Sequence, residues 1–297
     1  MDLPHHGRYE HSNIFARPDY IWPDGKRLAF YVCVAVEHFA FAAGVGEDQA
    51  VPNSPQTDRN YAWRDYGQRV GLWRLLDMLD GLGIPVALAV NSLIFPLQPC
   101  LAARLCRRND EVVAHGRTSS ESHASMWPDD EAAAVRDVTT TIAEQFGRAP
   151  LGWASPALAE SAETLDILAQ NNYRYVLDWP ADDQPFWIGT RSGALLSVPF
   201  PLEMNDTTVL LHRHHSGREF ADMIVNQFDE MLSLSQQRAL VLPLMLHPYI
   251  VGQPFRLRAL RKALAHCRDA RFADQVWFTR PGDIARYCMG LSPGIIP

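Results

Sequence analysis

Several features that define particular protein classes are missing from this sequence of 297 residues. No continuous apolar run approaches the ~20 residues that a membrane-spanning helix needs, and the first residues lack the basic and apolar regions of a secretion signal. No basic run with interleaved aromatic side chains is present, and 27 basic against 34 acidic residues leave a formal charge of −7. We therefore expect a soluble, cytoplasmic protein that has neither a nucleic-acid nor a membrane partner.

The cysteines and the repeat content exclude further classes. The five cysteines are an odd number, lie far apart and never form a C-x-x-C pair, so neither a disulfide framework nor a thiolate zinc site is indicated. No repeat of fixed period and no low-complexity segment is present. An apolar content of 47% is ample for a sizeable core, which excludes a disordered chain.

Strand-like and helix-like segments alternate through most of the chain. Residues 1–26 are polar and contain prolines, which predicts an arm that lies over the body or over a neighbouring subunit. Residues 27–297 predict one α/β domain, a distorted (β/α) barrel of about seven strands that resembles a TIM barrel. The polar loop at 42–62 is unusually long, which favours an active-site lid or a contact in a homo-oligomer. Strands are expected at 28–36, 84–90, 111–114, 151–156, 173–177, 195–200, 240–246 and 276–279, and helices at 66–82, 96–107, 129–146, 161–171, 220–234, 255–267 and from 283.

Three of the predicted strands stop abruptly at ionisable side chains. The first ends in Glu37-His38, the strand at 111–114 is followed by His115-Gly116, and the strand at 240–246 is followed by His247. In a parallel barrel the carboxyl ends of the strands meet on one rim, where catalytic residues are normally found. This pattern predicts an enzyme with a site on that rim.

The order of these motifs resembles the polysaccharide deacetylase (NodB-homology) superfamily, and in particular its allantoinase-like branch. The resemblance covers roughly residues 20–290. It implies a catalytic groove at the strand ends and a hydrolase that acts on carbon–nitrogen bonds other than peptide bonds. The motifs that carry it are Glu37, Glu111-Val-Val-Ala-His115-Gly116, Gly152-Trp153-x-x-Pro156, Leu177-Asp178-Trp179 and Leu244-x-Leu246-His247-Pro248.

The chain departs from the deacetylase pattern at two places that concern a metal ion. Typical members have two adjacent aspartates after the first strand, whereas this chain has Glu37 alone, and their second metal-binding imidazole is replaced here by Ser119. A hydroxyl is a poor Zn²⁺ ligand, and a stable site needs three or four ligands. Glu37, His115 and His123 together approximate a site with two imidazoles and one carboxylate for a divalent metal such as Zn²⁺. The allantoinase-like branch tends to lack the second histidine, which favours a weak metal site or none.

Hydrolysis of an amide-like bond requires an activated water, oxyanion stabilisation and a proton for the leaving nitrogen. Glu37 is the candidate general base or metal ligand, and His247 the candidate general acid or oxyanion donor. Asp178 matches the aspartate of the family's fourth motif, which orients a catalytic group. A structural role remains open for each of them, including a surface position for Glu37 and a packed histidine at position 247.

Other polar and aromatic residues are candidates for binding a small-molecule substrate. Asn205 and Asp206 offer an amide and a carboxylate that match the donors and acceptors of a ureide, although a turn explains them equally well. The remaining candidates are Arg117, Trp153, Trp179 and Arg256.

The sequence thus predicts a hydrolase that opens a small cyclic amide or ureide, similar to allantoin or an imide. The alternatives are a metal-dependent N-deacetylase of an acetylated sugar, acting in carbohydrate metabolism, and an inactive ligand-binding protein of the same fold. A shared fold alone does not distinguish them.

Overall fold

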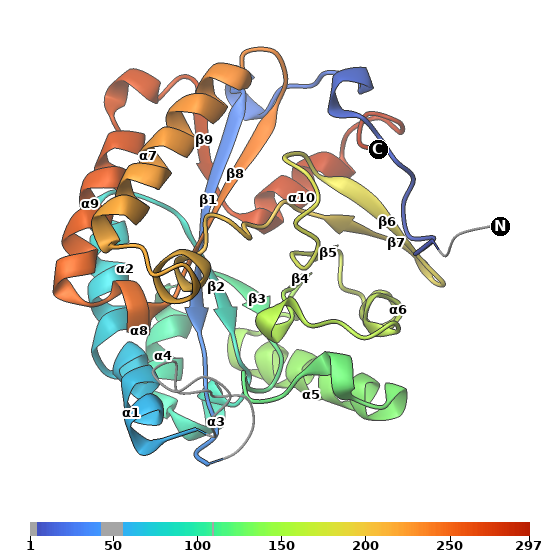
Figure 1. Cartoon of the computed structure of the whole chain (residues 1–297). Helices are drawn as coiled ribbons and strands as arrows, with labels where there is room; N and C mark the ends of the chain where they lie inside the picture. Colours follow the sequence, from blue (N-terminus) through green and yellow to red (C-terminus); the bar gives the residue numbers. More distant parts are fainter. Residues whose placement is uncertain (1–4, 43–55, 109) are drawn as a thin grey trace.

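A twisted sheet of nine strands forms the centre of the molecule in the computed structural model, which describes residues 5–42, 56–108 and 110–297 (Figure 1). The strand order is β6-β7-β5-β4-β3-β2-β1-β8, and β9 pairs with β1. All pairings are parallel except that of β6 with β7. The bounds are β1 (Leu28–Val36), β2 (Val86–Val90), β3 (Glu111–Ala114), β4 (Gly152–Trp153), β5 (Tyr175–Val176), β6 (Phe186–Thr190), β7 (Gly193–Ser197), β8 (Leu240–Leu246) and β9 (Val276–Thr279).

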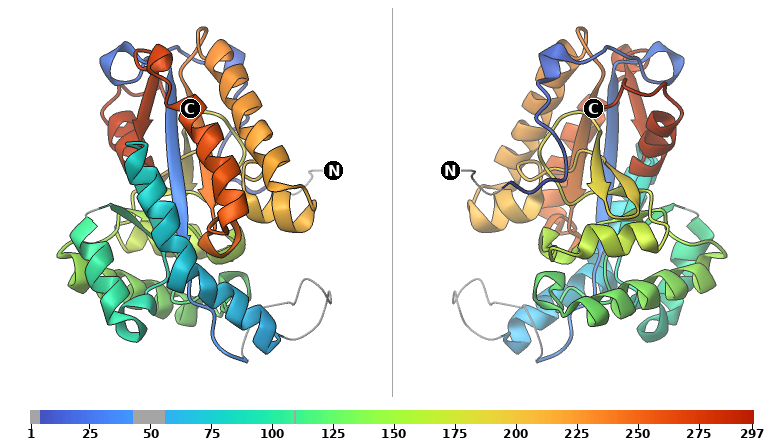
Figure 2. Two further views of the ribbon diagram at one scale, coloured as in Figure 1. Left: turned by 90° about the vertical axis from the view of Figure 1, so that its left-hand side faces the viewer. Right: turned by 90° about the vertical axis from the view of Figure 1, so that its right-hand side faces the viewer.

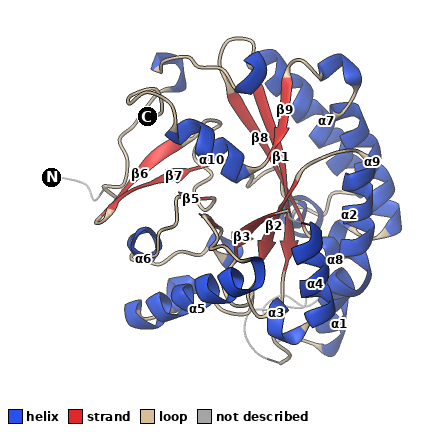
Figure 3. Cartoon of the chain, turned by 180° about the vertical axis from the view of Figure 1, so that it is seen from behind, coloured by secondary structure: helices blue, strands red, loops and turns tan. Residues whose placement is uncertain are grey.

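Helices cover the outer surface of this sheet, as the view from behind shows (Figure 3). Helices α7 and α9 lie side by side along one face, which the side views show in orange and orange-red (Figure 2). The bounds are α1 (Asp58–Tyr66), α2 (Leu72–Gly81), α3 (Ile94–Leu97), α4 (Pro99–Arg108), α5 (Pro128–Phe146), α6 (Thr164–Gln170), α7 (Gly217–Leu234), α8 (Pro248–Val251), α9 (Pro254–Cys267) and α10 (Pro281–Met289).

Strand β1 organises the core because all nine of its residues are buried. Successive side chains of a strand point to opposite faces, so Phe30 and Val32 pack in the cluster beneath the helices, whereas Tyr31 and Cys33 pack in the cluster on the other face. A strand buried on both faces is a continuous apolar run, which is why its position was visible in the sequence. The predicted α/β fold with a largely parallel, barrel-like sheet is confirmed.

The antiparallel hairpin β6–β7 differs from expectation, since a single strand was predicted in this region. The apolar run of β6 is only three residues long, Phe186–Ile188, before Gly189 and Thr190, and so short a run was not recognised as a strand. The N-terminal arm lies against this edge of the sheet, where the Gly189 N–H donates to the Arg8 carbonyl at 2.6 Å. Arg8 also forms an ion pair with Asp166 at 3.1 Å, so the described part of the arm contacts the body of its own chain.

The predicted helix at 66–82 is divided in the structure into the end of α1, a π-helical turn at Gly67–Gly71, and α2. A Cβ atom on Gly71, the last residue of this turn, would lie 2.1 Å from the Pro248 carbonyl oxygen, so only glycine fits against α8. A Cβ on Gly252 would likewise lie 2.4 Å from the Cα of Gly71. This backbone-to-backbone approach holds the π-helical turn and the start of α2 against the residues that follow His247.

Within the described ranges no helix is long and apolar enough to cross a membrane. The greater part of the predicted lid loop, residues 43–55, lies outside the described residues.

Candidate active site

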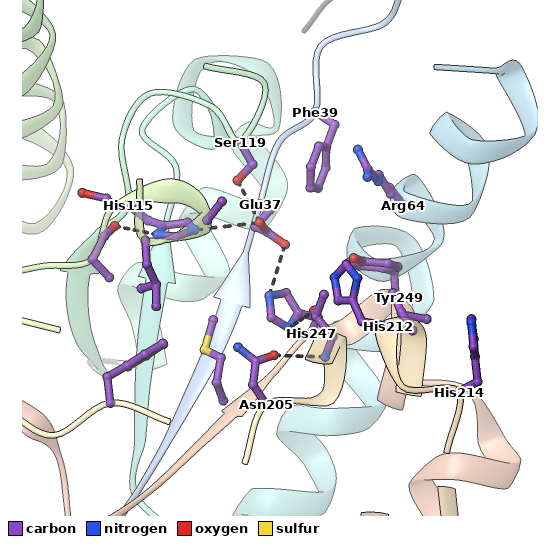
Figure 4. Close-up of a pocket in the computed structure, with 18 residues that line it drawn as sticks. Glu37, Phe39, Arg64, His115, Ser119, Asn205, His212, His214, His247 and Tyr249 are labelled. Carbon is purple, nitrogen blue, oxygen red and sulfur yellow. Dashed lines mark hydrogen bonds and ion pairs between the residues drawn. The ribbon is translucent and has the colours of Figure 1, made fainter. Parts of the chain in front are cut away.

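Glu37, the first residue after β1, lies at the centre of a cavity of about 510 Å³ on the carboxyl-end rim of the sheet (Figure 4). Its Oε1 atom accepts a hydrogen bond from the Ser119 hydroxyl at 2.8 Å and lies 3.8 Å from His115 Nε2. Its Oε2 atom lies 3.9 Å from His247 Nε2 and is buried with no hydrogen-bond partner in the described chain. The two predicted histidines of the rim, His115 and His247, therefore both face the carboxylate of the third predicted residue, Glu37.

His115 is held in place from behind by the backbone. Its Nδ1 atom lies 2.7 Å from the Ala154 carbonyl, which only accepts, so Nδ1 carries the proton and Nε2 faces Glu37. Gly116 then turns the chain with a φ of 66°, and a Cβ there would lie 3.0 Å from Pro156 Cγ. The glycine after His115 is thus required both by its backbone conformation and by close packing.

Asp206 positions His247 on the opposite side of Glu37. The Oδ1 atom of Asp206 lies 2.6 Å from His247 Nδ1, and its Oδ2 atom accepts the His247 backbone N–H at 2.7 Å. Because Asp206 is fully buried and both of its oxygens are occupied, the structure gives it a positioning role in place of the substrate contact predicted from the sequence.

For both Glu37 and His247, burial favours the neutral form of the side chain, whereas the neighbouring charges favour the charged form. Burial disfavours the charged form of Glu37, but the nearby His115 imidazole, the charge of His247 and the Ser119 hydroxyl outweigh it and lower the pKa of Glu37 to about 2. Burial likewise disfavours a charged His247, but the charge and hydrogen bond of Asp206 raise its pKa above the ordinary value. The arrangement favours a carboxylate facing an imidazolium.

Asn91 and Ser119 were not predicted as functional residues, yet they connect the two sides of the rim. The Asn91 Oδ1 atom accepts the backbone N–H of His38 at 2.7 Å and that of Ser119 at 3.1 Å, and its Nδ2 donates to the His115 carbonyl. Asn91 directly follows strand β2, so the same strand-end signal that identified Glu37 was available for it.

The walls of the cavity are largely apolar, with Phe39, Phe200 and Met245 among the lining residues. Asn205 also lines it: its Oδ1 accepts the Thr207 N–H at 3.0 Å, and no acceptor in the described chain takes the Nδ2 hydrogens. Asn205 therefore offers two donors to a bound carbonyl. On the rim, Ala157 has a φ of 56°, a left-handed conformation that is costly for a residue with a side chain and is often found at functional sites.

The structure does not bring His123 to Glu37 and His115. His123 is 1% exposed, and its Nδ1 lies 3.3 Å from Glu131 Oε1 inside the protein. The metal-binding set of Glu37, His115 and His123 is therefore not assembled, because the chain carries His123 inward against the Trp153 ring.

The aromatic and acidic candidates of the third and fourth motifs lie behind the cavity. Trp153 is fully buried and donates to the Ser155 hydroxyl at 2.9 Å, while Trp179 donates to Glu160 at 2.9 Å. Asp178 accepts the backbone N–H of Ser155 at 2.7 Å. Since Ser155 lines the cavity, Asp178 acts on its wall and not on the substrate directly.

The two predicted arginines lie elsewhere. Arg117 forms an ion pair with Glu121 at 2.5 Å and does not line the cavity. Arg256 lines a separate groove between α7 and α9.

The residues of the site do not fit a zinc ion. In the ranges that the structure describes, no group of three or more His, Cys, Asp or Glu side chains is arranged to hold a metal. Glu37 and His115 supply two suitable ligands, but the third family position is the Ser119 hydroxyl, which already donates to Glu37. The donor set falls short of the three protein ligands of a catalytic zinc site.

Comparisons with known proteins support the fold. No family model matches the chain. The crystal structure of PuuE allantoinase superimposes with a TM-score of 0.85 at 23% identity, covering 99% of this chain and 99% of that one. A Pseudomonas aeruginosa PAO1 structure, assigned by name to the polysaccharide deacetylases, has a TM-score of 0.81 at 22% identity, covering 93% and 95% of the two chains.

A Schizosaccharomyces pombe protein, also assigned by name to the polysaccharide deacetylases, is 23% identical over 282 residues, which are 88% of this chain and 85% of that protein. A structure of a family 4 acetyl xylan esterase from Clostridium thermocellum, with 14% identity over 91% of this chain and 93% of that one and a TM-score of 0.50, contains a cobalt ion. The predicted resemblance is confirmed: the chain has the fold of the polysaccharide deacetylase superfamily, with the allantoinase structure among its matches.

Proposed function

We propose that this protein is a hydrolase that opens a small cyclic amide or ureide at a carbon–nitrogen bond other than a peptide bond. The observation that carries the proposal is a single carboxylate, Glu37, held between the Nε2 atoms of His115 and His247 in a cavity lined by both apolar and polar side chains. Such a site provides a proton acceptor and a proton donor on either side of a bound carbonyl group. A cavity of about 510 Å³ suits a ring-sized molecule.

In the proposed mechanism Glu37 accepts a proton from the attacking water. A carboxylate whose pKa is about 2 is a weak base toward free water. The hydroxyl proton becomes far more acidic, however, as the water oxygen bonds to the carbonyl carbon, so transfer to Glu37 accompanies this bond formation. The negative charge that develops on the carbonyl oxygen is stabilised by N–H donors, for which Asn205 Nδ2 is available.

His247 then supplies the proton that the leaving nitrogen needs. Asp206 holds the Nδ1 side of the imidazole and favours its protonated form, so the Nε2–H points toward Glu37 and the cavity. Transfer of the Nε2 proton to nitrogen lets the carbon–nitrogen bond break, and the proton held by Glu37 restores the imidazolium. The net reaction adds one water across the bond.

The donor set further supports a reaction that needs no metal ion. The family 4 fold can hold a divalent metal, but this chain has a hydroxyl at the third ligand position. We therefore expect turnover of a cyclic substrate to persist after treatment with a chelator.

The test is hydrolysis of allantoin, hydantoin, succinimide, glutarimide and N-acetylglucosamine oligomers, before and after chelation and with added Zn²⁺. We expect turnover of a cyclic compound that survives chelation and is lost in Glu37→Gln. Glu144→Gln, an exposed residue of α5, is the matched control. Chelation-sensitive release of acetate from the sugar would instead identify a metal-dependent deacetylase, and the absence of any turnover would favour a binding role.

A further inference from the structure

A groove of about 830 Å³ between α7 and α9 carries a concentration of positive charge on a protein whose formal charge is −7. Arg218 lines it from the start of α7, and Arg256, Arg258 and Lys262 line it from α9. Asp222 is the only carboxylate among its described lining residues. The groove therefore has a local charge opposite to that of the whole chain.

These cations have no ion-pair partner within 4.0 Å in the described part of the chain. Some arginines at other sites are paired, as Arg8 is with Asp166 and Arg108 is with Asp80. The positive charge of the groove is thus not compensated by the fold itself.

The spacing of the basic residues along the two helices places their side chains in the same groove. Arg258 and Lys262 are four residues apart on α9, so they share a face, and Arg218 faces them from α7. Like charges in this spacing destabilise a helix by a few tenths of a kcal/mol. An anion between the two helices would remove this repulsion and gain contacts with both.

Arg256 at the inner end of the groove is half-buried. Its side-chain carbons lie against Gly217, where a Cβ would be 3.1 Å from Arg256 Cγ. Its guanidinium makes one long hydrogen bond, from Nη1 to the Ile250 carbonyl at 3.4 Å. The guanidinium also lies 5.2 Å from the centre of the Phe255 ring, a contact that uses none of its N–H donors. A partly buried guanidinium with five donors and one weak hydrogen bond has donor capacity that a ligand can use.

We propose that this groove binds a small polyanion that carries phosphate groups. Guanidinium groups bind phosphate oxygens in pairs, and cations on two facing helices can contact more than one phosphate. A second protein copy fits less well, because the core of a protein interface is depleted in charged residues and enriched in apolar ones. The groove is instead hollow, and its volume lies in the range of small-molecule sites.

The experiment is calorimetric titration of inorganic triphosphate into the whole protein at fixed, low ionic strength, because exposed charges are screened by salt. The double variant Arg258→Ala/Lys262→Ala should bind at least roughly tenfold more weakly. Arg136→Ala, which removes one exposed cation from α5, should bind as the parent protein does. Arg258→Lys should bind more weakly than the parent protein but more tightly than the double variant, since the charge remains and the paired guanidinium contact is lost.

Equal affinity in the double variant and the parent protein would overturn the proposal. So would an equal loss in Arg136→Ala, which would show a general charge effect. A changed oligomeric state on size-exclusion chromatography with unchanged triphosphate affinity would assign the groove to a second copy of the chain. Since the groove contains none of the cavity residues, hydrolysis at Glu37 can be tested independently.

Discussion

The histidine–glutamate cluster at Glu37 and the one at Glu131 differ in what satisfies the carboxylate. Glu131 is fully buried and accepts hydrogen bonds at 2.5 Å from both the Thr164 and the Ser161 hydroxyls, in addition to its contact with His123. Glu37 has one hydroxyl donor, and its Oε2 has no hydrogen-bond partner in the described chain. The two carboxylates therefore have the same chemistry but different capacities to act on a ligand.

The difference shows why residue type alone does not define a site. A carboxylate whose two oxygens both accept hydrogen bonds from the protein, and which does not line a cavity, stabilises the fold and has no acceptor left for a ligand. An incompletely satisfied carboxylate that lines a cavity retains an acceptor for a substrate or a water. The four predictions that follow test this contrast.

The largest expected effect is on catalysis, from Glu37→Gln. An amide cannot accept the water proton, so we expect kcat/KM for the cyclic substrate to fall by about 10³-fold. The melting temperature should also fall at pH 7, because His115 and His247 stabilise the charged form of Glu37 and lower its pKa to about 2, so kcat/KM is measured at a temperature where the variant is folded. Steady-state kinetics and a thermal melt on the same preparation measure both, and a rate close to that of the parent would remove Glu37 from the mechanism.

The converse effect is expected for Glu131→Gln. Glu131→Gln removes a buried carboxylate that accepts hydrogen bonds from the Ser161 and Thr164 hydroxyls, which costs about 3 kcal/mol of unfolding free energy. The hydrogen bonds of His123, Ser161 and Thr164 outweigh the opposing effect of burial and lower the pKa of Glu131. Its stabilising contribution is therefore present above its ordinary pKa of 4.5 and is lost as the pH falls.

Chemical denaturation of Glu131→Gln at pH 7 and at pH 4 tests this prediction. The difference from the parent should be large at pH 7 and smaller at pH 4, with kcat/KM of the folded protein within a few-fold of the parent value. A catalytic loss without a loss of stability would contradict the contrast between the two clusters.

Asp206→Asn should weaken catalysis without abolishing it. The asparagine is nearly isosteric, but it removes the charge that favours an imidazolium at His247 and weakens the Nδ1 hydrogen bond. We expect kcat to fall by about 10²-fold with little change in KM, because a positioning residue acts on the proton transfer and not on substrate contact. A change in KM alone would instead indicate the substrate contact that the sequence predicted.

The smallest expected effect concerns two neighbouring carboxyls behind the cavity wall, the half-buried Glu160 and the buried Asp178. Burial, followed by the Asp178 charge, raises the pKa of Glu160. A carboxyl whose folded pKa is raised contributes stability that is fully present below its ordinary pKa of 4.5 and is lost as the pH rises.

Glu160→Gln removes this titration while keeping the side chain nearly isosteric. Its melting temperature should exceed that of the parent by roughly 2–4 °C at pH 9, where the parent has lost stability. At pH 4 the two proteins should melt at similar temperatures. Differential scanning calorimetry at both values measures the difference, and an equal shift at both would exclude proton uptake by this pair.

The sequence by itself determined the core and the three rim residues. β1 and β8 are continuous apolar runs, because strands of a parallel sheet are buried on both faces, and each run ends at the residue that enters the cavity. Where an apolar run ends can be read from the sequence alone. Because the carboxyl ends of parallel strands meet on one rim, Glu37, His115 and His247 could be placed there without tertiary information.

Only the tertiary structure decided what each polar residue near the rim does. His123 and His115 are both histidines close to one motif, yet a loop and a short helix direct one into the interior and the other into the cavity. Asp206 contacts His247 across 41 residues of sequence, and such a long-range pairing leaves no local pattern. How many hydrogen bonds a carboxylate accepts depends on which donors the fold brings to it, and packing between distant segments of the chain determines those donors.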